Sequence, residues 1–322
     1  MTIVTGGAGF IGRNLVAALN RRGQTDLLLV DLLGETAKWR NLRGLVFEDI
    51  IAPGDLLGWL ERPDRPPVTA IAHLGACSST TAVDADFLLA NNYRYTRDLA
   101  TWALAHEVRF VYASSAATYG NGALGYSDLD AVTERLEPLN MYGYSKHLFD
   151  LWALHTGLFD RIVGLKFFNV YGPFEDHKES MRSVVAKAHE QIAATGRLSL
   201  FRSYREDVAD GAQRRDFVYV DDAVATVLHF LDHPELHGLF NCGTGLSRSW
   251  LDLATAVFAA IGKPADVEFV DMPESIRAHY QYFTEADTTK LAAAGLAAPF
   301  STLEQGVQRY VTTHLATQSA TR

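Results

Sequence analysis

Hydrophobic and polar positions alternate in blocks along the first 170 residues of the chain. Residues 13–22 carry Leu15, Ala18 and Leu19 at helical spacing. Around this helix, five short runs are continuously apolar rather than alternating: 1–5, 27–31, 70–74, 110–113 and 162–168. Such runs are typical of strands buried on both faces, in a parallel sheet that helices cover. The pattern predicts an α/β fold built on a Rossmann-like, doubly wound parallel sheet.

The pattern loosens after residue 168. Residues 202–215 are polar and charged and contain Gly211, which predicts a loop on the surface or over a site. The sequence from Leu251 onward is mostly helical, and strand-like runs resume at 216–220, 238–242 and 267–270. We predict two domains between which the chain crosses: a sheet domain of residues 1–168 and 217–245, and a smaller mixed α/β domain of residues 169–216 and 246–322.

Composition narrows the functional classes. The 322 residues carry a formal net charge of -9, which argues against a nucleic-acid partner. Cys77 and Cys242 show no CxxC spacing and are too few for a disulfide framework, so a reducing compartment is expected. The 11 histidines show no paired metal-ligand spacing, so no metal site is expected. Gly6 interrupts the first apolar run, and no run approaches the roughly 18 apolar residues of a membrane span. We therefore expect a cytoplasmic protein with no membrane partner.

A glycine-rich turn follows the first predicted strand and opens the first predicted helix. Gly6, Gly9 and Gly12 have GxxGxxG spacing, which allows a tight turn and close approach of backbone to a pyrophosphate at the helix N-terminus. Asp31 ends the next strand and could accept hydrogen bonds from an adenosine ribose, which favours NAD, or could be a solvated strand end. Lys38 lies just beyond, with Arg40, and could meet the 2′-phosphate of NADP. The residues leave NAD and NADP both open.

A second motif combines Ser115, Tyr142 and Lys146. Tyr142 and Lys146 form a YxxxK motif, which puts both side chains on one helical face. A tyrosine has a pKa near 10, and an adjacent ammonium favours its phenolate, so Tyr142 is predicted to transfer protons. Ser115 ends an apolar strand, where ligands of open α/β sheets bind, and its hydroxyl could hydrogen-bond the reacting oxygen.

Seven stretches resemble the ADP-L-glycero-D-manno-heptose 6-epimerase family of extended short-chain dehydrogenase/reductases over residues 1–310. The stretches are TGGAGFIG from Thr5, GACSSTT from Gly75, ASSAATYG from Ala113, PLNMYGYSK from Pro138, FFNVYGP from Phe167, RDFVYV from Arg215 and NCGTG from Asn241. Several of these are general to sugar-nucleotide epimerases and dehydratases. The narrower signals are GACSSTT, the group of His177, Lys178, Ser180 and Met181, and the run from Tyr280 to Thr284.

The resemblance implies a reaction and its participants. The implied substrate is ADP-D-glycero-β-D-manno-heptose, epimerised at C6 for lipopolysaccharide heptose supply by transient oxidation to a ketone and re-reduction with tightly held NADP, with NAD possible. Because hydride leaves one face of C6 and returns to the opposite face, the reaction needs two proton-transfer groups. In the family these correspond to Tyr142 and Lys178. Without the resemblance, Lys178 reads as an ordinary loop lysine. The family also implies a homo-oligomer, with a pentamer suggested.

The resemblance also transfers binding residues one by one. It adds the following cofactor contacts to the three glycines: Phe10, Ile11, Asp31, Leu32, Lys38, Leu74, Gly75, Ala76, Cys77, Ser78, Asn91, Lys146, Val170 and Lys178. The substrate contacts that it implies are Asn169, Ser180, Lys187, Phe201, Arg215 and Tyr280. Arg215 suits a diphosphate, because a guanidinium binds phosphate bidentately; the alternative is an ion pair with Asp216 or Asp221. His73 and Trp102 are expected to be packing residues, and Cys77 to touch the cofactor only through its backbone.

The chain departs from the family pattern at three places. The family often has an acidic residue where Leu74 stands, and usually a histidine where Lys187 stands, although His189 is close. Phe201 is followed by Arg-Ser-Tyr, and the loop from there to Arg215 is longer. These departures concern the shape of the nucleotide pocket rather than the chemistry.

Three other functions are alternatives to this one. A 4,6-dehydratase needs an acidic pair after the strand-end hydroxyl, where this chain has Ala116 and Ala117. A UDP-sugar 4-epimerase differs only in pocket residues and is the nearest alternative. A non-catalytic NADP-binding sensor typically lacks the tyrosine or lysine of the YxxxK motif, and both are present here.

Overall fold

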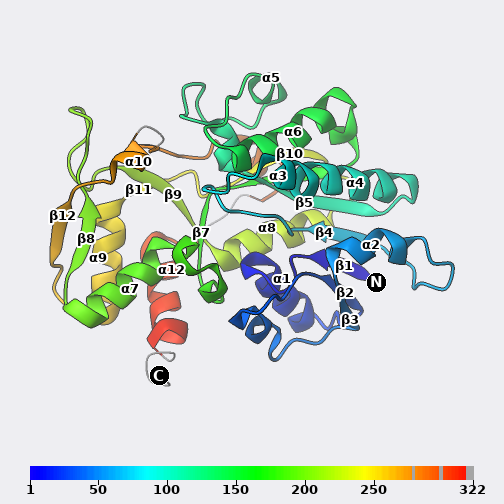
Figure 1. Ribbon diagram of the computed structural model, residues 1–322, viewed down its shortest axis with the longest axis horizontal. Helices are drawn as coiled ribbons and strands as arrows, with labels where there is room; N and C mark the ends of the chain where they lie inside the picture. Colours follow the sequence, from blue (N-terminus) through cyan, green and yellow to red (C-terminus); the bar gives the residue numbers. More distant parts are fainter. Residues whose placement is uncertain (278–279, 297–299, 317–322) are drawn as a thin grey trace.

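Seven parallel strands form the central sheet of the computed structural model, which describes residues 1–277, 280–296 and 300–316 (Figure 1). Their order across the sheet is β10-β6-β5-β4-β1-β2-β3. The strands are β1 (Thr2–Thr5), β2 (Leu27–Val30), β3 (Asp49–Ile51), β4 (Ala70–His73), β5 (Arg109–Ser115), β6 (Val163–Phe167) and β10 (Gly238–Cys242). The predicted Rossmann-like parallel sheet is therefore confirmed, and its order reverses between β1 and β4, where such sheets bind ligands.

Alternate side chains of most central strands enter two hydrophobic clusters, one on each face of the sheet. Val4 and Val111 pack on one face with α1 (Phe10–Arg21) and α8 (Val220–Asp232). Ile3 and Phe110 pack on the other with α2 (Pro53–Leu60), α4 (Tyr95–Ala105) and α6 (Met141–His155). Burial on both faces explains why these strands are continuously apolar.

Two smaller sheets and three helices form the rest of the molecule. The sheets are β11 (Ser247–Ser249), β9 (Arg214–Tyr219) and β7 (Asn169–Tyr171), and β12 (Val267–Val270) beside β8 (Leu198–Phe201). Helices α7 (Val184–Thr195) and α12 (Leu303–Tyr310) both pack against α9 (Trp250–Ile261). All of these elements come from residues outside the central sheet. The exact division of the chain into two domains stays a prediction.

The observed boundaries correct several predictions. The first helix begins at Phe10 rather than Arg13, directly after Gly9. The predicted loop 202–215 is shorter, because Arg214 and Arg215 already pair with Ser249 and Arg248 in the β9–β11 ladder. Strands β3, β7, β8 and β11 had no clear sequence signal, since they are short and carry polar or exposed positions.

Shorter elements connect these layers. The remaining α-helices are α3 (Ala85–Leu88), α5 (Asp130–Thr133), α10 (Glu274–Arg277) and α11 (Thr289–Ala293). The 3₁₀ turns are η1 (Ala37–Leu42), η3 (Ala116–Tyr119), η4 (Leu158–Asp160) and η5 (Asp176–Met181), and the π-helical turns are η2 (Leu89–Arg94) and η6 (Val311–Leu315). Within the described ranges, every helix is too short or too polar to cross a membrane.

Candidate active site

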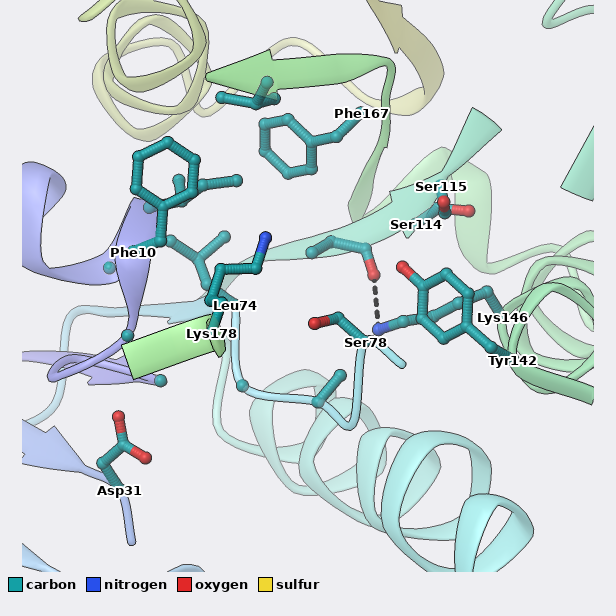
Figure 2. A pocket seen from close by; sticks show the side chains of 18 of the residues that line it. Phe10, Asp31, Leu74, Ser78, Ser114, Ser115, Tyr142, Lys146, Phe167 and Lys178 are labelled. Carbon is teal, nitrogen blue, oxygen red and sulfur yellow. Dashed lines mark hydrogen bonds between the residues drawn. The ribbon is translucent and has the colours of Figure 1, made fainter. Parts of the chain in front are cut away.

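A cleft opens at the carboxyl ends of the central strands and collects most of the predicted residues (Figure 2). Its lining includes the predicted residues Gly6, Gly9, Phe10, Ile11, Gly12, Asp31, Lys38, Leu74, Gly75, Ala76, Ser78, Ser115, Tyr142, Lys146, Val170 and Lys178. Leu32, Cys77 and Asn91 line an adjoining pocket, which shares Gly6, Asp31 and Lys38 with the cleft. The structure thus brings every predicted cofactor contact to one continuous region.

The glycine-rich turn is packed too tightly for side chains. Gly6 has a φ of +68°, and a Cβ there would lie 2.8 Å from the Gly75 nitrogen. A Cβ on Gly12 would lie 2.0 Å from the Gly6 carbonyl oxygen. Gly9 precedes α1 and has no side chain to cap it, so first-turn N–H groups are available to an anion. This backbone cradle at a helix N-terminus fits the pyrophosphate of a nicotinamide dinucleotide.

Asp31 is held by its neighbours and is not a solvated strand end. Its Oδ2 accepts a hydrogen bond from the Ala8 backbone N–H at 2.9 Å. Its Oδ1 accepts from the Leu32 N–H at 2.7 Å and from the Lys38 ammonium at 2.5 Å. The Lys38 charge therefore stands directly beside the carboxylate in the cleft.

Ser115, Tyr142 and Lys146 meet where β5 and α6 approach each other (Figure 2). The Lys146 ammonium donates to the Ala113 carbonyl oxygen at 2.8 Å. Burial lowers the pKa of Lys146 to about 8, and Asp150 partly opposes this. Burial raises the pKa of Tyr142, and its hydrogen bond with Ser115 lowers it by less. Desolvation of the phenolate therefore dominates, and the net shift of the Tyr142 pKa is upward.

A fully buried polar network supports this trio from behind. Asp150, one turn after Lys146 on α6, accepts hydrogen bonds from Tyr112 at 2.8 Å and Ser114 at 2.7 Å. The Lys166 ammonium lies 3.0 Å from the same carboxylate, and both side chains are 0% exposed. The network joins α6 to β5 and β6, so it fixes the two elements that carry the trio. Sequence reasoning missed it, although the spacing from Lys146 to Asp150 is a helical one.

Lys178 enters the cleft from η5, a separate segment. Its amine and the Tyr142 hydroxyl both point into the middle of the cavity (Figure 2). The Lys178 Nζ lies 5.4 Å from the centroid of the Phe10 ring. Burial lowers the pKa of Lys178, while the Glu175 carboxylate raises it and Lys187 lowers it further. Desolvation thus makes loss of a proton from the Lys178 ammonium easier.

The six predicted substrate residues fall into separate places. Asn169 lines a pocket that continues from Lys178 to Phe217 and Trp250. Ser180 and Lys187 line a shallow hollow with Arg182. Phe201 ends β8 and is partly exposed. Arg215 and Tyr280 lie together.

Arg215 is buried between two aromatic rings rather than in an ion pair with Asp216 or Asp221. Its guanidinium carbon is 5.6 Å from the Trp250 ring centroid and 5.3 Å from that of Tyr280. The Trp250 Nε1–H donates to the Tyr280 hydroxyl at 2.9 Å, which ties the two rings together. The sequence does not predict Trp250 as a neighbour of Arg215, since it lies 35 residues away and outside the seven family-like stretches.

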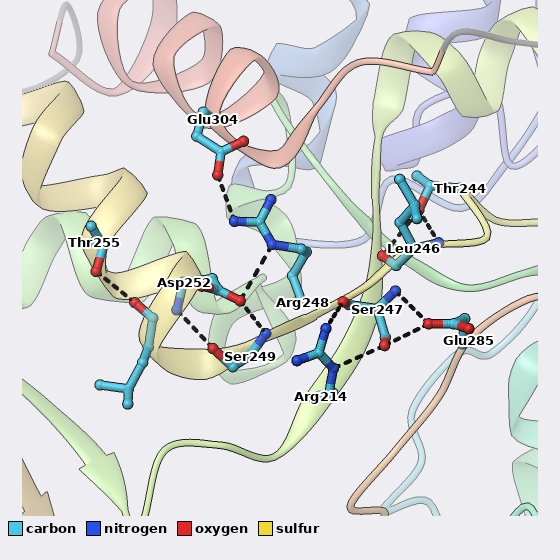
Figure 3. A network of polar contacts seen from close by, with 11 residues as sticks. Arg214, Thr244, Leu246, Ser247, Arg248, Ser249, Asp252, Thr255, Glu285 and Glu304 are labelled. Carbon is cyan, nitrogen blue, oxygen red and sulfur yellow. Dashed lines mark hydrogen bonds and ion pairs between the residues drawn. The ribbon is translucent and has the colours of Figure 1, made fainter.

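The strand that carries Arg215 is fixed by a polar network on its outer side (Figure 3). Arg214 donates to the Ser247 hydroxyl at 3.0 Å, and Ser247 donates to Glu285 at 2.7 Å. The neighbouring Arg248 binds Asp252 of α9 at 3.3 Å and Glu304 of α12 at 2.6 Å. The β9–β11 pair is thereby fixed to both helices.

Comparison with known sequences defines the class of protein. Residues 2–243 match the NAD dependent epimerase/dehydratase family. The match covers well over half of the chain, and the glycine cradle and the Ser115–Tyr142–Lys146 cluster lie within it. The chain belongs to the NAD dependent epimerase/dehydratase family.

Individual relatives have more specific names than the family as a whole. The chain is 51% identical over 317 residues to the ADP-L-glycero-D-manno-heptose-6-epimerase of Nitratidesulfovibrio vulgaris (strain DP4), covering 98% of each sequence. It is 44% identical over 331 residues to the enzyme of the same name from Fusobacterium nucleatum subsp. nucleatum, covering 99% of each. The resemblance inferred from the motifs is therefore confirmed.

Solved structures agree with the fold. The crystal structure of Helicobacter pylori ADP-L-glycero-D-manno-heptose-6-epimerase superposes with a TM-score of 0.81 at 26% identity, covering 96% of this chain and 94% of that one. A UDP-N-acetylglucosamine 4-epimerase from Methanobrevibacter ruminantium gives a TM-score of 0.80 at 22% identity and covers 98% of both chains. At that identity the likeness shows the fold alone.

Proposed function

We propose that the protein interconverts ADP-D-glycero-β-D-manno-heptose and ADP-L-glycero-β-D-manno-heptose at C6, in the supply of heptose for lipopolysaccharide. The observation that carries the proposal is that Tyr142 and Lys178 point into one cavity from different elements. Inversion of C6 by oxidation to a ketone and re-reduction from the opposite face would take a proton from the C6 oxygen in one orientation of the substrate and return one in the other. Relatives named for this reaction, at 44–51% identity over nearly the whole chain, support the choice of substrate.

Ser115 and Tyr142 would act on the C6 oxygen together. The Ser115 hydroxyl orients that oxygen by a hydrogen bond, and the Tyr142 phenol exchanges a proton with it. The Lys146 ammonium is held at the Ala113 carbonyl and adds positive charge near the phenol. In the second orientation of the sugar, the Lys178 amine takes the place of the phenol. Burial lowers the pKa of Lys178, which makes such an exchange easier.

The cofactor in this proposal is NADP. When bound, it would supply the hydride acceptor and donor for C6. The glycine cradle fits its pyrophosphate, and Phe10, Leu74 and Ser78 line the cleft beyond. Lys38 favours NADP over NAD, because its ammonium partly neutralises Asp31 and attracts a 2′-phosphate.

The ADP group of the substrate is assigned to the pocket that continues from Lys178 towards Trp250. Asn169 and Trp250 line it, and Arg215 and Tyr280 both lie next to Trp250. Ser180, Lys187 and Phe201 are assigned to its outer rim. The resemblance to the family further supports a homo-oligomer that works in the cytoplasm.

The test is incubation of the purified protein with ADP-D-glycero-β-D-manno-heptose without added cofactor, followed by proton NMR of the C6 epimers. Appearance of the L-glycero epimer is expected, with cofactor retained by the protein and recycled. Turnover of UDP-galactose at an equal rate would overturn the heptose assignment and favour a 4-epimerase.

A further inference from the structure

The carboxylate of Glu175 is buried outside the groups assigned above, next to the segment that carries Lys178. Glu175 is 0% exposed. It accepts hydrogen bonds from the Ser183 backbone N–H at 2.6 Å, the Ser183 hydroxyl at 2.5 Å and the Tyr310 hydroxyl at 3.0 Å. All three donors are neutral. Burial raises the pKa of Glu175, and the hydrogen bonds from Ser183 and Tyr310 and the charge of Lys178 oppose that rise. Ser183 is the N-cap of α7, so the positive end of that helix also favours the carboxylate.

Glu175 also begins the turn on which Lys178 stands. The Lys178 backbone N–H donates to the Glu175 carbonyl oxygen at 2.9 Å, which closes the first turn of η5. Two residues without glycine's freedom flank this turn in left-handed conformations, Phe174 at φ +73° and Glu179 at φ +48°. Such conformations persist only where the surroundings hold them.

The opposite side of the same turn is attached to the cofactor cradle. The Asn41 amide donates to the Phe174 carbonyl oxygen at 3.3 Å and to the Ala8 carbonyl oxygen at 2.9 Å. The Arg13 guanidinium lies 3.5 Å from the centroid of the Phe174 ring. The Lys178 turn is therefore held between the glycine-rich loop on one side and the Glu175 contacts on the other.

We propose that Glu175 is the positioning residue of Lys178: its carboxylate locks the turn to α7 and α12 and thereby aims the ammonium into the cavity that Tyr142 shares. The inference rests on the proposed function in one respect, the use of Lys178 as a proton-transfer group. The Tyr310 contact brings α12, 135 residues later in the chain, into the support of the site.

Glu175 has an electrostatic effect in addition to the mechanical one. Its negative charge raises the pKa of Lys178, against burial and against Lys187 on α7. The other titratable groups around the turn and cleft are Asp176 and His177 on η5, Asp31 and Lys38 across the cleft, and Tyr142 and Lys146 on α6. Removing the Glu175 charge while these remain should lower the pKa of Lys178.

The test compares Glu175→Gln with Tyr310→Phe in the full-length protein. Glu175→Gln keeps the side-chain shape but removes the charge, whereas Tyr310→Phe removes one hydrogen bond and keeps the charge. The pKa of Lys178 is read from its rate of acetylation by acetic anhydride against pH, with the modified peptide quantified by mass spectrometry. Lys263, which follows α9, is the internal control. This readout needs no substrate, so it stays informative even if the heptose assignment fails.

In Glu175→Gln we expect a lower pKa of Lys178, with kcat reduced by about tenfold or more and KM changed by less than about twofold. In Tyr310→Phe we expect an unchanged pKa and a smaller loss of kcat, and Glu175→Asp should restore the pKa but only part of kcat. An unchanged pKa of Lys178 in Glu175→Gln would overturn the proposal. If Glu175→Gln does not fold, full activity in Tyr310→Phe would overturn the positioning role.

Discussion

At the residue scale, two tyrosines of α6 lie close together in the sequence but differ in their position relative to the cleft. Tyr142 lines the cleft, whereas Tyr144, two residues later, is 45% exposed. Tyr142→Phe should reduce kcat by about 10² to 10⁴, because in the proposed reaction it removes the group that exchanges a proton with the C6 oxygen. Tyr144→Phe should match the parent in steady-state assays with the ADP-heptose. If Tyr142→Phe were as active as the parent, another group would have to be the base.

The residues of the site differ in how far sequence alone could find them. Helical spacing is enough to pair Tyr142 with Lys146. Lys178 needed a family resemblance, because no local pattern distinguishes it from a surface lysine. Glu175 was missed because its partner Tyr310 is 135 residues away. The rise in the Tyr142 pKa depends on burial, which follows from packing and not from spacing.

At the scale of elements, His73 links three of them where the sheet order reverses. It ends β4, is 0% exposed, and lies 2.7 Å from the Thr5 hydroxyl of β1 and 2.9 Å from the Thr96 hydroxyl of α4. Thr96 already donates to the Asn92 carbonyl, so the histidine must donate to it through Nε2. Nδ1 then accepts from Thr5, whose oxygen receives the Gly75 N–H. These contacts suit a neutral ring, and burial together with Lys146 lowers the pKa of His73 to about 3.

This histidine should make folding sensitive to acid. The folded-state pKa lies below the unfolded value near 6.5, so the unfolded chain binds the proton first and stability falls as pH drops from 6.5 towards 3. The loss from this group is about 2 kcal/mol at pH 5. Urea denaturation of the parent and of His73→Asn at pH 7 and pH 5 measures it. The variant should lose about 2 kcal/mol less than the parent between these pH values. Equal losses would mean that His73 is protonated in the fold.

The central strands and the smaller sheets also differed in predictability. Strands β1, β2, β4, β5, β6 and β10 are buried on both faces and therefore appear as apolar runs. Strand β9 was predicted two residues late, because its first residues are Arg214 and Arg215. Charged residues normally indicate a loop, and only the β11 ladder and the polar network of Figure 3 explain them in a strand.

At the scale of the whole molecule, the residues assigned to the cofactor and those assigned to the sugar nucleotide come from different segments of one chain. The cofactor cradle belongs to the first turns of the parallel sheet, which the glycine spacing predicts well. The residues assigned to the ADP group come from β7, β9 and α9, which belong to the smaller sheets and their helices. Their assembly depends on contacts between distant segments, such as Trp250 with Tyr280. The fold could therefore be predicted more completely than the substrate pocket.

This separation predicts that cofactor affinity and substrate affinity can be changed independently. Arg215→Lys keeps the charge but loses the planar, bidentate group between Trp250 and Tyr280. It should raise KM for the ADP-sugar about tenfold, or ~1.4 kcal/mol, and leave the dissociation constant of NADP unchanged.

Lys38→Ala should do the reverse: NADP binding weakens about tenfold while NAD binding changes little, since only NADP carries the 2′-phosphate. Isothermal titration with each dinucleotide, beside steady-state kinetics, measures both. If Arg215→Lys weakened NADP as much as the sugar nucleotide, the two sites would be coupled, and the assignment of Arg215 to the ADP group would be wrong.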